Sequence, residues 1–413
     1  MLLPRWQKTL SDFRERPAIF AKSGVITFSD LADGLAQFPV ARQPVIACGT
    51  PLEVALETLR GWRDQQPVVP LERPDASLPE LSAFFPKTAH VKLTPGNDGL
   101  PRGVHFTADQ IAADADRLVD AMGLSPRTPN LATVSVTHSY GYSSIILPLL
   151  LHGIPLQEVE VPFPAVVADA WKRHESVVVA AVPSMWRAWH RSGILEKAPI
   201  ALALSAGAPL TLDLETSVWE RHGLKLHNFY GASECGGISF DATDRPRSEE
   251  GDLGEPLPGV DVQVDEDGRF AVRSTSVALG YDHHRAGEVL GANLFLTPDH
   301  GHISGRKLIL DARGGEHINV AGRKLGPGRI EAALRATGLV RQVRVFGLPS
   351  SDAERVEEVA ALVPPDTDID SLRRAISEKI AGWEVPRHWF TSSKASDFGL
   401  SRAELQEAHA SHH

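Results

Sequence analysis

Cysteine is scarce in this chain of 413 residues, which contains only Cys48 and Cys235. Two cysteines provide no disulfide framework, so we expect a reducing, cytoplasmic location. Basic residues are also in the minority, because 42 Lys and Arg stand against 52 Asp and Glu, for a formal net charge of -10. This balance argues against nucleic acid or an anionic membrane as the main partner.

Long apolar runs are missing as well. The longest, IILPLLL at residues 145–151, is far shorter than the roughly 20 apolar residues of a membrane-spanning helix. The N-terminal segment MLLPRWQKTLSDFRERP is charged too early for a signal peptide. With 42% hydrophobic and 23% charged residues, the composition is that of a globular protein, and no membrane span is predicted.

Short apolar runs alternate with helical patterns over the first two thirds of the chain. Residues 131–137 and 177–182 favour buried strands, and residues 52–62 favour a helix. Thr107, followed by Gln110, begins another helical pattern with a capping box. The alternation predicts an α/β fold, in which a large N-terminal domain contains mixed, mostly parallel sheets covered by helices.

The pattern changes in the C-terminal part of the chain. Residues 259–274 alternate polar and apolar side chains around Asp267–Gly268, which predicts a β-rich hairpin region. Beyond Arg313, a helix–strand–strand–helix pattern predicts a small, mobile α+β domain of roughly 100 residues. The predicted domains are therefore residues 1–312 and residues 313–413.

Residues 93–104, LTPGNDGLPRGV, place glycines and prolines between apolar flanks. Such a segment forms neither a helix nor a good strand, since glycine is conformationally loose and proline lacks an amide donor. By its residues alone, it fits either a β-hairpin loop or a loop that binds an anion through backbone amides. It is not the phosphate loop of NTPases, because the Lys-Ser/Thr pair is missing, and the dinucleotide pattern GxGxxG is missing as well.

Residues 94–104 resemble TSGTTGxPKGV, the signature of adenylate-forming enzymes, which are the acyl-CoA synthetases, the adenylation domains of peptide synthetases and the luciferases. Five further segments are similar to motifs of that family and follow in its order. They are SYG at 139–141, SAGAPL at 205–210, NFYGASECGG at 228–237, LTPDHG at 296–301 and the hinge-like segment at 310–334. The chain is therefore identified as a compact, divergent member of this superfamily.

The resemblance implies a reaction. In the family, a carboxylate attacks the α-phosphate of ATP to give an acyl- or aryl-adenylate and pyrophosphate, and a thiol then takes the acyl group. The implied activity is that of an AMP-dependent acid–thiol ligase, which uses ATP and Mg²⁺, releases AMP, and transfers to CoA or to the phosphopantetheine of an acyl carrier protein. The alternative is a degenerate homologue that binds nucleotide, acyl-adenylate or carrier protein, or performs only thiol transfer, without efficient adenylation.

The resemblance also implies roles for individual residues. Tyr230 would stack on adenine, Ser233 would donate to a phosphate oxygen, and Glu234 would hold Mg²⁺. Asp299 would accept hydrogen bonds from the ribose hydroxyls. All the residues expected to bind the nucleotide are Thr94, Gly96, Gly99, Arg102, Gly207, Ala208, Tyr230, Gly231, Ser233, Asp299 and Arg313.

Three residues are implied as catalytic, namely Glu234, His138 and Lys394. By the same resemblance, the substrate, a small carboxylic acid, would lie against His138, Tyr140, Asn228 and Phe229. From the residues alone, His138 fits an ordinary core histidine almost as well. Gly315 would be the hinge that lets the C-terminal domain move.

The chain departs from the family in its glycine-rich loop, at Pro298, at Gly315 and near its C-terminus. In the glycine-rich loop, the hydroxyl residues of the family are replaced, and Asp98 brings a negative charge towards a polyanion. Near the C-terminus, Gly399 and Leu400 stand where the family has its catalytic lysine. Lys394 lies a few residues upstream and is either a substitute for that lysine or an ordinary surface residue.

Overall fold

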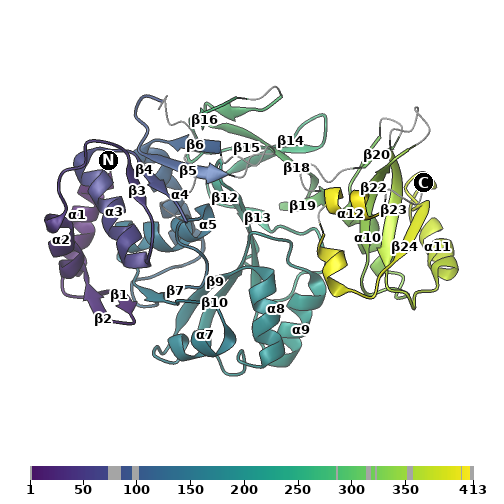
Figure 1. The fold of residues 1–413 in the computed structure, drawn as a ribbon, viewed down its shortest axis with the longest axis horizontal. Helices are drawn as coiled ribbons and strands as arrows, with labels where there is room; N and C mark the ends of the chain where they lie inside the picture. Colours follow the sequence, from purple (N-terminus) through teal and green to yellow (C-terminus); the bar gives the residue numbers. More distant parts are fainter. Residues whose placement is uncertain are drawn as a thin grey trace. The chain divides into compact units, whose positions relative to one another are not determined.

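The computed structural model of the chain describes residues 2–72, 85–94, 102–284, 287–312, 318–320, 323–350, 357–400 and 402–409 (Figure 1). The chain divides into two compact units. Unit 1 contains Met1–Glu249, Leu253–Val262 and Ala271–Leu296, and unit 2 contains Glu250–Asp252, Gln263–Phe270 and Thr297–His413. The predicted domain boundary between residues 312 and 313 falls beside a segment outside the described residues and stays a prediction.

A nine-stranded mixed sheet forms the centre of unit 1. Its strand order is β13 (Glu255–Pro256), β12 (Gly236–Phe240), β11 (Leu226–Ala232), β10 (Ile200–Ser205), β9 (Val177–Ala181), β7 (Asn130–Ala132), β8 (Leu156–Glu158), β1 (Pro17–Ala21) and β2 (Gly24–Thr27). The run from β11 to β1 is parallel, whereas β2, β12 and β13 pair antiparallel with their neighbours. The predicted α/β class, with mixed and mostly parallel sheets, is confirmed.

A second sheet of unit 1 carries the glycine-rich segment. Its order is β16 (Gly280–Tyr281), β6 (Arg102–Phe106), β5 (His90–Thr94), β4 (Val68–Pro70) and β3 (Val45–Ala47). Strands β5 and β6 pair antiparallel, with Thr94 opposite Arg102. The segments on both sides of the glycine-rich loop are therefore paired strands. Residues 95–101 lie outside the described residues, so the choice between a hairpin loop and an anion-binding loop stays open.

Helices cover the sheets of unit 1 and bury two apolar cores. They are α1 (Leu2–Phe13), α2 (Phe28–Gln37), α3 (Pro51–Asp64), α4 (Ala108–Ala121), α5 (Ser139–Gly141), the π-helix η1 (Tyr142–Ile146), α6 (Leu147–His152), α7 (Pro164–Trp171), α8 (Pro183–Ser192) and α9 (Leu212–His222). Helices α8 and α9 lie side by side next to β9 and β10 (Figure 1). Three tryptophans fill the core there, Trp171, Trp186 and Trp189. No helix among the described residues is long and apolar enough to cross a membrane.

The predicted hairpin region is a further sheet. Its order is β14 (Asp261–Val264), β15 (Arg269–Arg273), β18 (Leu294–Ser304) and β17 (Leu290–Gly291), and β19 (Lys307–Ala312) pairs with β18. The turn between β14 and β15 contains Gly268 at a φ of 84°, a left-handed conformation that glycine adopts without strain. The backbone amide of Gly268 donates to the carbonyl of Asp265 at 3.0 Å. The hairpin at Asp267–Gly268 is confirmed.

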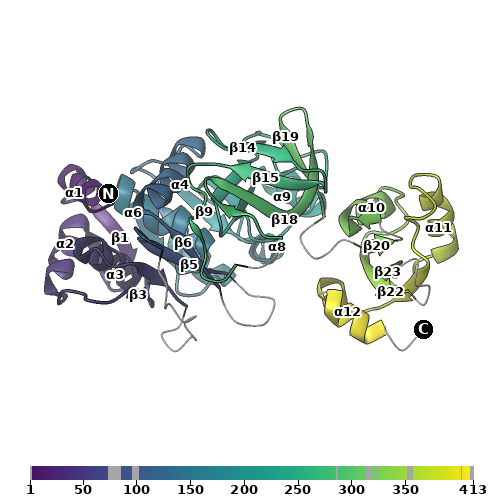
Figure 2. The same ribbon diagram turned by 90° about the horizontal axis from the view of Figure 1, so that it is seen from above.

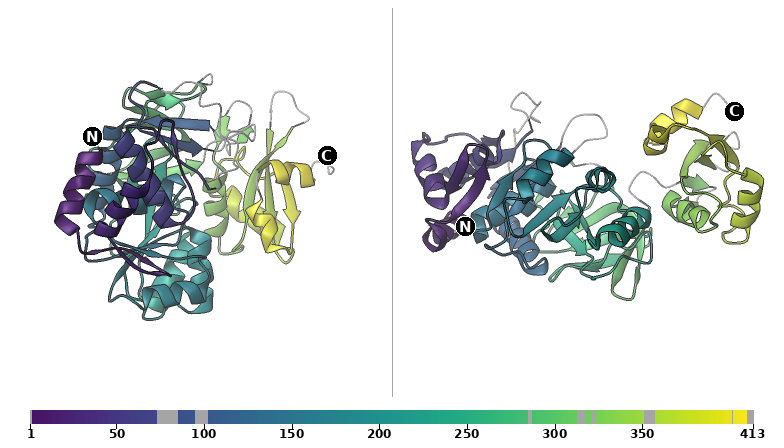
Figure 3. Two further views of the ribbon diagram at one scale, coloured as in Figure 1. Left: turned by 60° about the vertical axis from the view of Figure 1, so that its left-hand side comes forward. Right: turned by 90° about the horizontal axis from the view of Figure 1, so that it is seen from below.

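Within unit 2, the C-terminal elements form an α+β arrangement. A two-stranded sheet, β20 (Ile318–Val320) and β21 (Arg323–Leu325), accompanies a three-stranded sheet of β22 (Arg344–Pro349), β23 (Glu357–Val363) and β24 (His388–Thr391). The helices are α10 (Pro327–Arg335), α11 (Ile369–Ser377), the 3-10 helix η2 (Ala395–Gly399) and α12 (Arg402–His409). Helices α10 and α11 flank strands β20, β22 and β23 (Figures 2 and 3). The predicted α+β character of this part of the chain is confirmed.

Local sequence signals differ in how well they locate the elements. Helix α4 begins as predicted, with the Thr107 side chain accepting from Gln110 N in a capping box. The strand predicted over residues 131–137 ends early, because β7 stops at Ala132. The backbone amide of Thr133 turns back to the carbonyl of Leu131, and the Thr133 hydroxyl donates to Ala180 O. These hydrogen bonds replace the strand pairing that the apolar pattern predicted beyond Ala132.

A buried hydrogen-bond chain fixes the start of β5. The indole of Trp62 donates to His90 Nε2 at 2.9 Å, and His90 Nδ1 lies 3.2 Å from the Tyr142 hydroxyl. Because an indole only donates, Nε2 must accept, so Nδ1 carries the proton and donates to Tyr142. The Tyr142 hydroxyl in turn lies 3.1 Å from Thr58 Oγ1. Burial, with the charge of Lys92, lowers the pKa of His90 to about 3.

This histidine makes stability depend on pH. The folded pKa lies below the usual value of 6.5, so the stability that neutral His90 provides is complete above about pH 6.5 and falls as the pH approaches 3. We expect the free energy of unfolding to drop by about 2 kcal/mol between pH 7.5 and pH 5. Urea unfolding at both pH values measures it. His90→Gln should remove this part of the drop, and an identical pH dependence in the variant would contradict the assignment.

Candidate active site

Unit 1 contains a cavity of about 180 Å³ near the ends of β10 and β11. Helix α5, strands β5 and β11, the segment after β10 and the first residues of β12 contribute to its wall. The lining residues are Lys92, Leu118, Ser139, Tyr140, Ser143, Ala206, Gly207, Phe229, Gly231, Ala232, Ser233, Gly236 and Gly237. Three of the predicted motif segments, 139–141, 205–210 and 228–237, therefore contribute to the cavity wall, although they are far apart in the sequence.

Glycines at two positions leave this wall without side chains. Gly207 has a φ of 79° directly after β10, and Gly236 has a φ of 74° at the start of β12. A Cβ atom at Gly236 would lie 2.1 Å from Oδ1 of Asp114, so only glycine fits there without a shift of the buried carboxylate. The tight β11–β12 hairpin that results places Gly231 and Ser233 at the cavity.

Phe229 and Gly231 of β11 line the cavity, whereas their neighbours Asn228 and Tyr230 do not. Asn228 and Tyr230 are buried, with 5% of each residue exposed, and are not among the lining residues. Ala208 is likewise outside the lining, next to Gly207. The expected stacking of Tyr230 on adenine stays a prediction.

The two predicted site residues at helix α5, His138 and Tyr140, lie in different surroundings. The Tyr140 hydroxyl is buried at the cavity and has no hydrogen-bond partner among the described residues, and burial raises the pKa of this phenol. Its ring centre lies 6.0 Å from that of Phe229. His138, the N-cap of the helix, is exposed and lies 2.9 Å from Glu72 Oε1, so it does not line the cavity.

Ser233 is held by a second serine at the cavity wall. Ser139 Oγ donates to Ser233 Oγ at 3.0 Å. Because a hydroxyl has one proton and two lone pairs, Ser233 accepts this bond and keeps its own proton for another acceptor. The expected donation from Ser233 to a phosphate oxygen stays a prediction.

Glu234 is half-buried beside the cavity and makes a defined contact. Tyr281 donates its hydroxyl to Glu234 Oε1 at 2.9 Å. Burial raises the pKa of Glu234 above its ordinary value, and the Tyr281 hydrogen bond opposes this shift. The carboxylate is therefore oriented by a neutral donor while its charge is disfavoured by desolvation.

The guanidinium of Arg102 is engaged within the protein. It forms a two-bond ion pair with Glu288, at 2.6 and 2.8 Å, and donates to His283 O at 2.9 Å. It also stacks on the Tyr281 ring, 3.8 Å from the ring centre. These contacts raise the pKa of Arg102. The positive charge that was expected to face phosphate is thus balanced by Glu288.

Sequence analysis missed a buried lysine at the cavity. Lys92 Nζ, on β5, is 3% exposed at the side chain, donates to Ser143 Oγ at 2.9 Å and lies 3.8 Å from Asp114 Oδ2. Burial lowers the pKa of Lys92, and the Asp114 carboxylate opposes that shift. A signal existed, because Asp114 occupies a position on the apolar face of α4 between Ile111 and Leu118.

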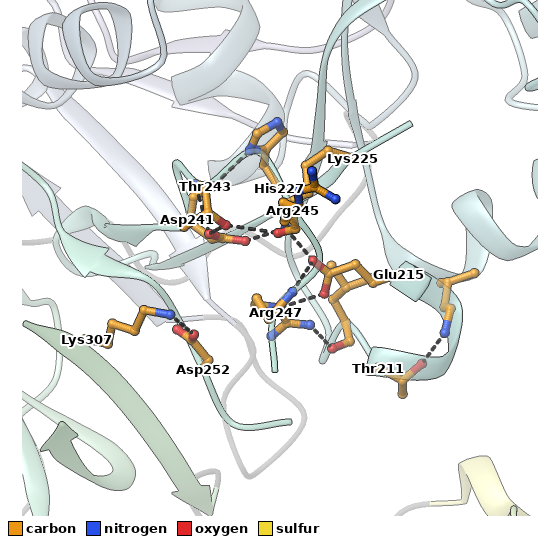
Figure 4. Close-up of polar contacts among 12 residues, drawn as sticks. Thr211, Glu215, Lys225, His227, Asp241, Thr243, Arg245, Arg247, Asp252 and Lys307 are labelled. Atoms are coloured by element: carbon orange, nitrogen blue, oxygen red, sulfur yellow. Dashed lines mark hydrogen bonds and ion pairs between the residues drawn. The ribbon is translucent and has the colours of Figure 1, made fainter. Parts of the chain in front are cut away.

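A buried charge network supports the two ends of the β11–β12 hairpin (Figure 4). Lys225, directly before β11, donates to Glu215 of α9 and to Asp241, which directly follows β12. Glu215 also accepts from Arg247 Nε at 2.8 Å, and Arg247 donates to the carbonyl of Leu210 at 2.6 Å. The side chains of Glu215 and Arg247 are 0% and 1% exposed, so each charge depends on its partner.

The remaining predicted residues lie in unit 2 or outside the described residues. Asp299 is on β18, where its carbonyl accepts from Thr297 Oγ1 at 3.1 Å. Lys394 is exposed, directly before η2, and its backbone amide donates to Ser392 Oγ at 3.1 Å. Gly96, Gly99, Arg313 and Gly315 are outside the described residues. Within the described parts of the chain, no group of three or more His, Cys, Asp or Glu side chains is arranged to hold a metal ion.

Comparison with known proteins decides the family. The model of the family described as AMP-binding enzyme matches residues 74–282, about half of the chain, and this match contains the cavity. The chain belongs to the AMP-binding enzyme family. It is similar to YngI of Bacillus subtilis, at 26% identity over 351 residues, which cover 76% of this chain and 62% of YngI. The chain thus spans less than two thirds of that relative.

Two further comparisons characterise this AMP-binding enzyme. It is 25% identical over 325 residues to 2-succinylbenzoate–CoA ligase of Escherichia coli, with 76% of this chain and 68% of that protein covered. Its fold is similar to that of ATP-bound MatB from Rhodopseudomonas palustris, with a TM-score of 0.81, 17% identity and 99% of both chains covered. The similarity to MatB shows that the two chains share a fold.

Proposed function

We propose that this AMP-binding enzyme is a carboxylate–thiol ligase, which activates a small carboxylic acid with ATP and transfers the acyl group to the thiol of CoA. One observation carries the proposal: the motif residues Ser139, Tyr140, Gly207, Phe229 and Ser233 line one cavity. The cavity has a volume of about 180 Å³, and its lining includes residues expected at the nucleotide as well as residues expected at the acid. The relative named a CoA ligase supports the thiol acceptor.

In the proposed first step, a carboxylate oxygen of the acid bonds to the α-phosphorus of ATP, and the bond from that phosphorus to pyrophosphate breaks. Charge builds on the phosphate oxygens, so fixed donors stabilise the transition state. Ser233 supplies one such donor, because Ser139 occupies one of its lone pairs and leaves its proton available. The backbone around Gly207 stays open to the nucleotide, since the residue carries no side chain.

Mg²⁺ fits the acidic residue of this site. Magnesium is usually held by one or two carboxylates together with substrate phosphates, and Glu234 is a single carboxylate that Tyr281 orients. Burial raises the pKa of Glu234, and a cation that arrived with the nucleotide would favour the charged carboxylate. When bound, the ion would neutralise charge on the phosphates.

Ser233→Ala tests the nucleotide site. We expect the variant to bind ATP about 10- to 100-fold more weakly, since a hydrogen bond to a charged oxygen is lost, and to bind adenosine as the unaltered protein does. Isothermal titration calorimetry with both ligands measures the difference. Ser192→Ala is the control, because the Ser192 hydroxyl bonds only to Trp189 O among the described residues. Equal losses for ATP and adenosine would contradict the role of Ser233.

A further inference from the structure

The cavity contains a cation that the proposed reaction does not use. Lys92 belongs to β5 and lines the cavity, with its side chain 3% exposed. Lysine is almost never this buried unless a partner compensates its charge. Asp114 is that partner, with a side chain also 3% exposed and Oδ2 3.8 Å from Nζ. The pair is electrically balanced but too far apart for a hydrogen bond.

The ammonium group therefore retains hydrogen-bonding capacity. It has three N–H donors, and among the described residues Ser143 Oγ is its one hydrogen-bond acceptor, at 2.9 Å. The Phe106 ring lies 4.9 Å from Nζ and accommodates the charge on another side. At least one donor is left for a ligand in the cavity.

A second unused donor lines the same cavity. The Tyr140 hydroxyl is buried and has no hydrogen-bond partner among the described residues. A buried hydroxyl without a partner is unfavourable, which points to a partner supplied by a ligand. The lining of the same cavity also includes the apolar side chains of Leu118 and Phe229, so Lys92 and Tyr140 both present donors to a cavity whose wall is partly apolar.

We propose that Lys92 and Tyr140 bind a neutral oxygen substituent of the acid, so that the enzyme selects hydroxy- or oxo-substituted carboxylic acids; the inference rests on the proposed function. A carbonyl or hydroxyl oxygen has two lone pairs and accepts from both donors. A second carboxylate fits less well, because Asp114 already balances Lys92 and an added anion would be uncompensated in a buried site.

The experiment measures acid affinity separately from turnover. Calorimetry in the presence of AMP compares benzoate with the hydroxybenzoates and terephthalate, and pentanoate with levulinate and glutarate. We expect the hydroxy or oxo acid of at least one series to bind at least tenfold more tightly than its unsubstituted parent and its dicarboxylate. Pyrophosphate release is measured in parallel. A protein that releases no pyrophosphate but still binds the substituted acid more tightly would contradict the proposed function and leave this inference standing.

Two variants test whether Lys92 and Tyr140 cause the preference for the substituted acid. Lys92→Met should reduce the preference for the substituted acid about 10- to 100-fold while affinity for the parent acid changes little. Lys22→Met is the control, since Lys22 is exposed and pairs with Glu160. Lys92→Met could fail to fold because the charge of Asp114 loses its partner. In that case the double variant Lys92→Met/Asp114→Asn, in which both charges are removed, is used in place of the single variant.

Tyr140→Phe distinguishes a role in binding the acid from a role in stability. Because the hydroxyl has no hydrogen-bond partner in the described parts of the chain, the thermal unfolding temperature should stay the same or rise, while the preference for the substituted acid falls. Three results would overturn the inference: tighter binding of the parent acid or the dicarboxylate, no discrimination in either series, or an equal effect of Lys92→Met on every acid.

Discussion

Glu215→Ala is expected to destabilise unit 1 by about 3–5 kcal/mol, the usual effect of removing one partner from a buried ion pair. Glu215 is fully buried and accepts from both Lys225 and Arg247 (Figure 4). Its loss removes the carboxylate that pairs with the buried Arg247 guanidinium and leaves Lys225 paired with Asp241. The expectation concerns the penalty of removing one member of a buried charge network, not the net worth of the intact network.

Urea denaturation followed by tryptophan fluorescence measures this loss, because Trp186 and Trp189 lie in the core beside α9. Glu220→Ala on the same helix is the matched control, since Glu220 is exposed, and should change stability by less than about 0.5 kcal/mol. Equal stability of the two variants would contradict the account. A secondary loss of nucleotide affinity in Glu215→Ala is expected, because Lys225 and Asp241 hold both ends of the hairpin that carries Ser233.

Gly399→Lys is expected to raise the rate of adenylate formation about 100-fold or more. The resemblance places the family's lysine at Gly399 or Leu400, and removing one preorganised donor of developing charge typically costs ~3 kcal/mol in the transition state. The structure separates the two positions. A Cβ atom at Gly399 meets nothing within 4 Å, whereas Leu400 packs against the apolar cluster of Phe346 and Leu405. Leu400→Lys would therefore lose packing as well as gain a charge.

Gly382→Lys is the matched control, because a Cβ atom there also meets nothing within 4 Å and the added charge is the same. Pyrophosphate exchange into ATP, with an acid that the unaltered protein accepts, measures the rate. An unchanged rate in Gly399→Lys, or an equal gain in Gly382→Lys, would show that this lysine is not what limits the reaction. Lys394→Ala in the unaltered protein tests whether that exposed lysine substitutes for it.

Short-range signals in the sequence predicted the fold well. The capping box at Thr107 and the turn at Asp267–Gly268 are local interactions, and both are present as predicted. The motif segments also indicated much of the cavity, since Tyr140 and Phe229 line it. Such features depend on residues a few positions apart, or on a motif whose shape is the same throughout a family.

Features that depend on distant partners could not be predicted. The ion pair of Arg102 with Glu288 joins two segments that no local pattern relates, so the charge of Arg102 was expected to be available. Lys92 lies in an apolar strand pattern, and only the packing of α4 against the cavity wall supplies Asp114 as its counter-ion. His138 differs for a similar reason, because its side chain is exposed and its partner, Glu72, is distant in the sequence.

Acid-dependent pyrophosphate exchange by the unaltered protein tests the proposed ligase activity most directly. Labelled pyrophosphate, ATP, Mg²⁺ and a panel of small carboxylic acids are incubated without CoA. The account predicts slow exchange that requires an acid, and loss of that exchange in Ser233→Ala but not in Ser192→Ala. Binding of ATP or of a synthetic acyl-adenylate without exchange for any acid of the panel would contradict it, and would identify the chain as a degenerate homologue that does not form adenylates.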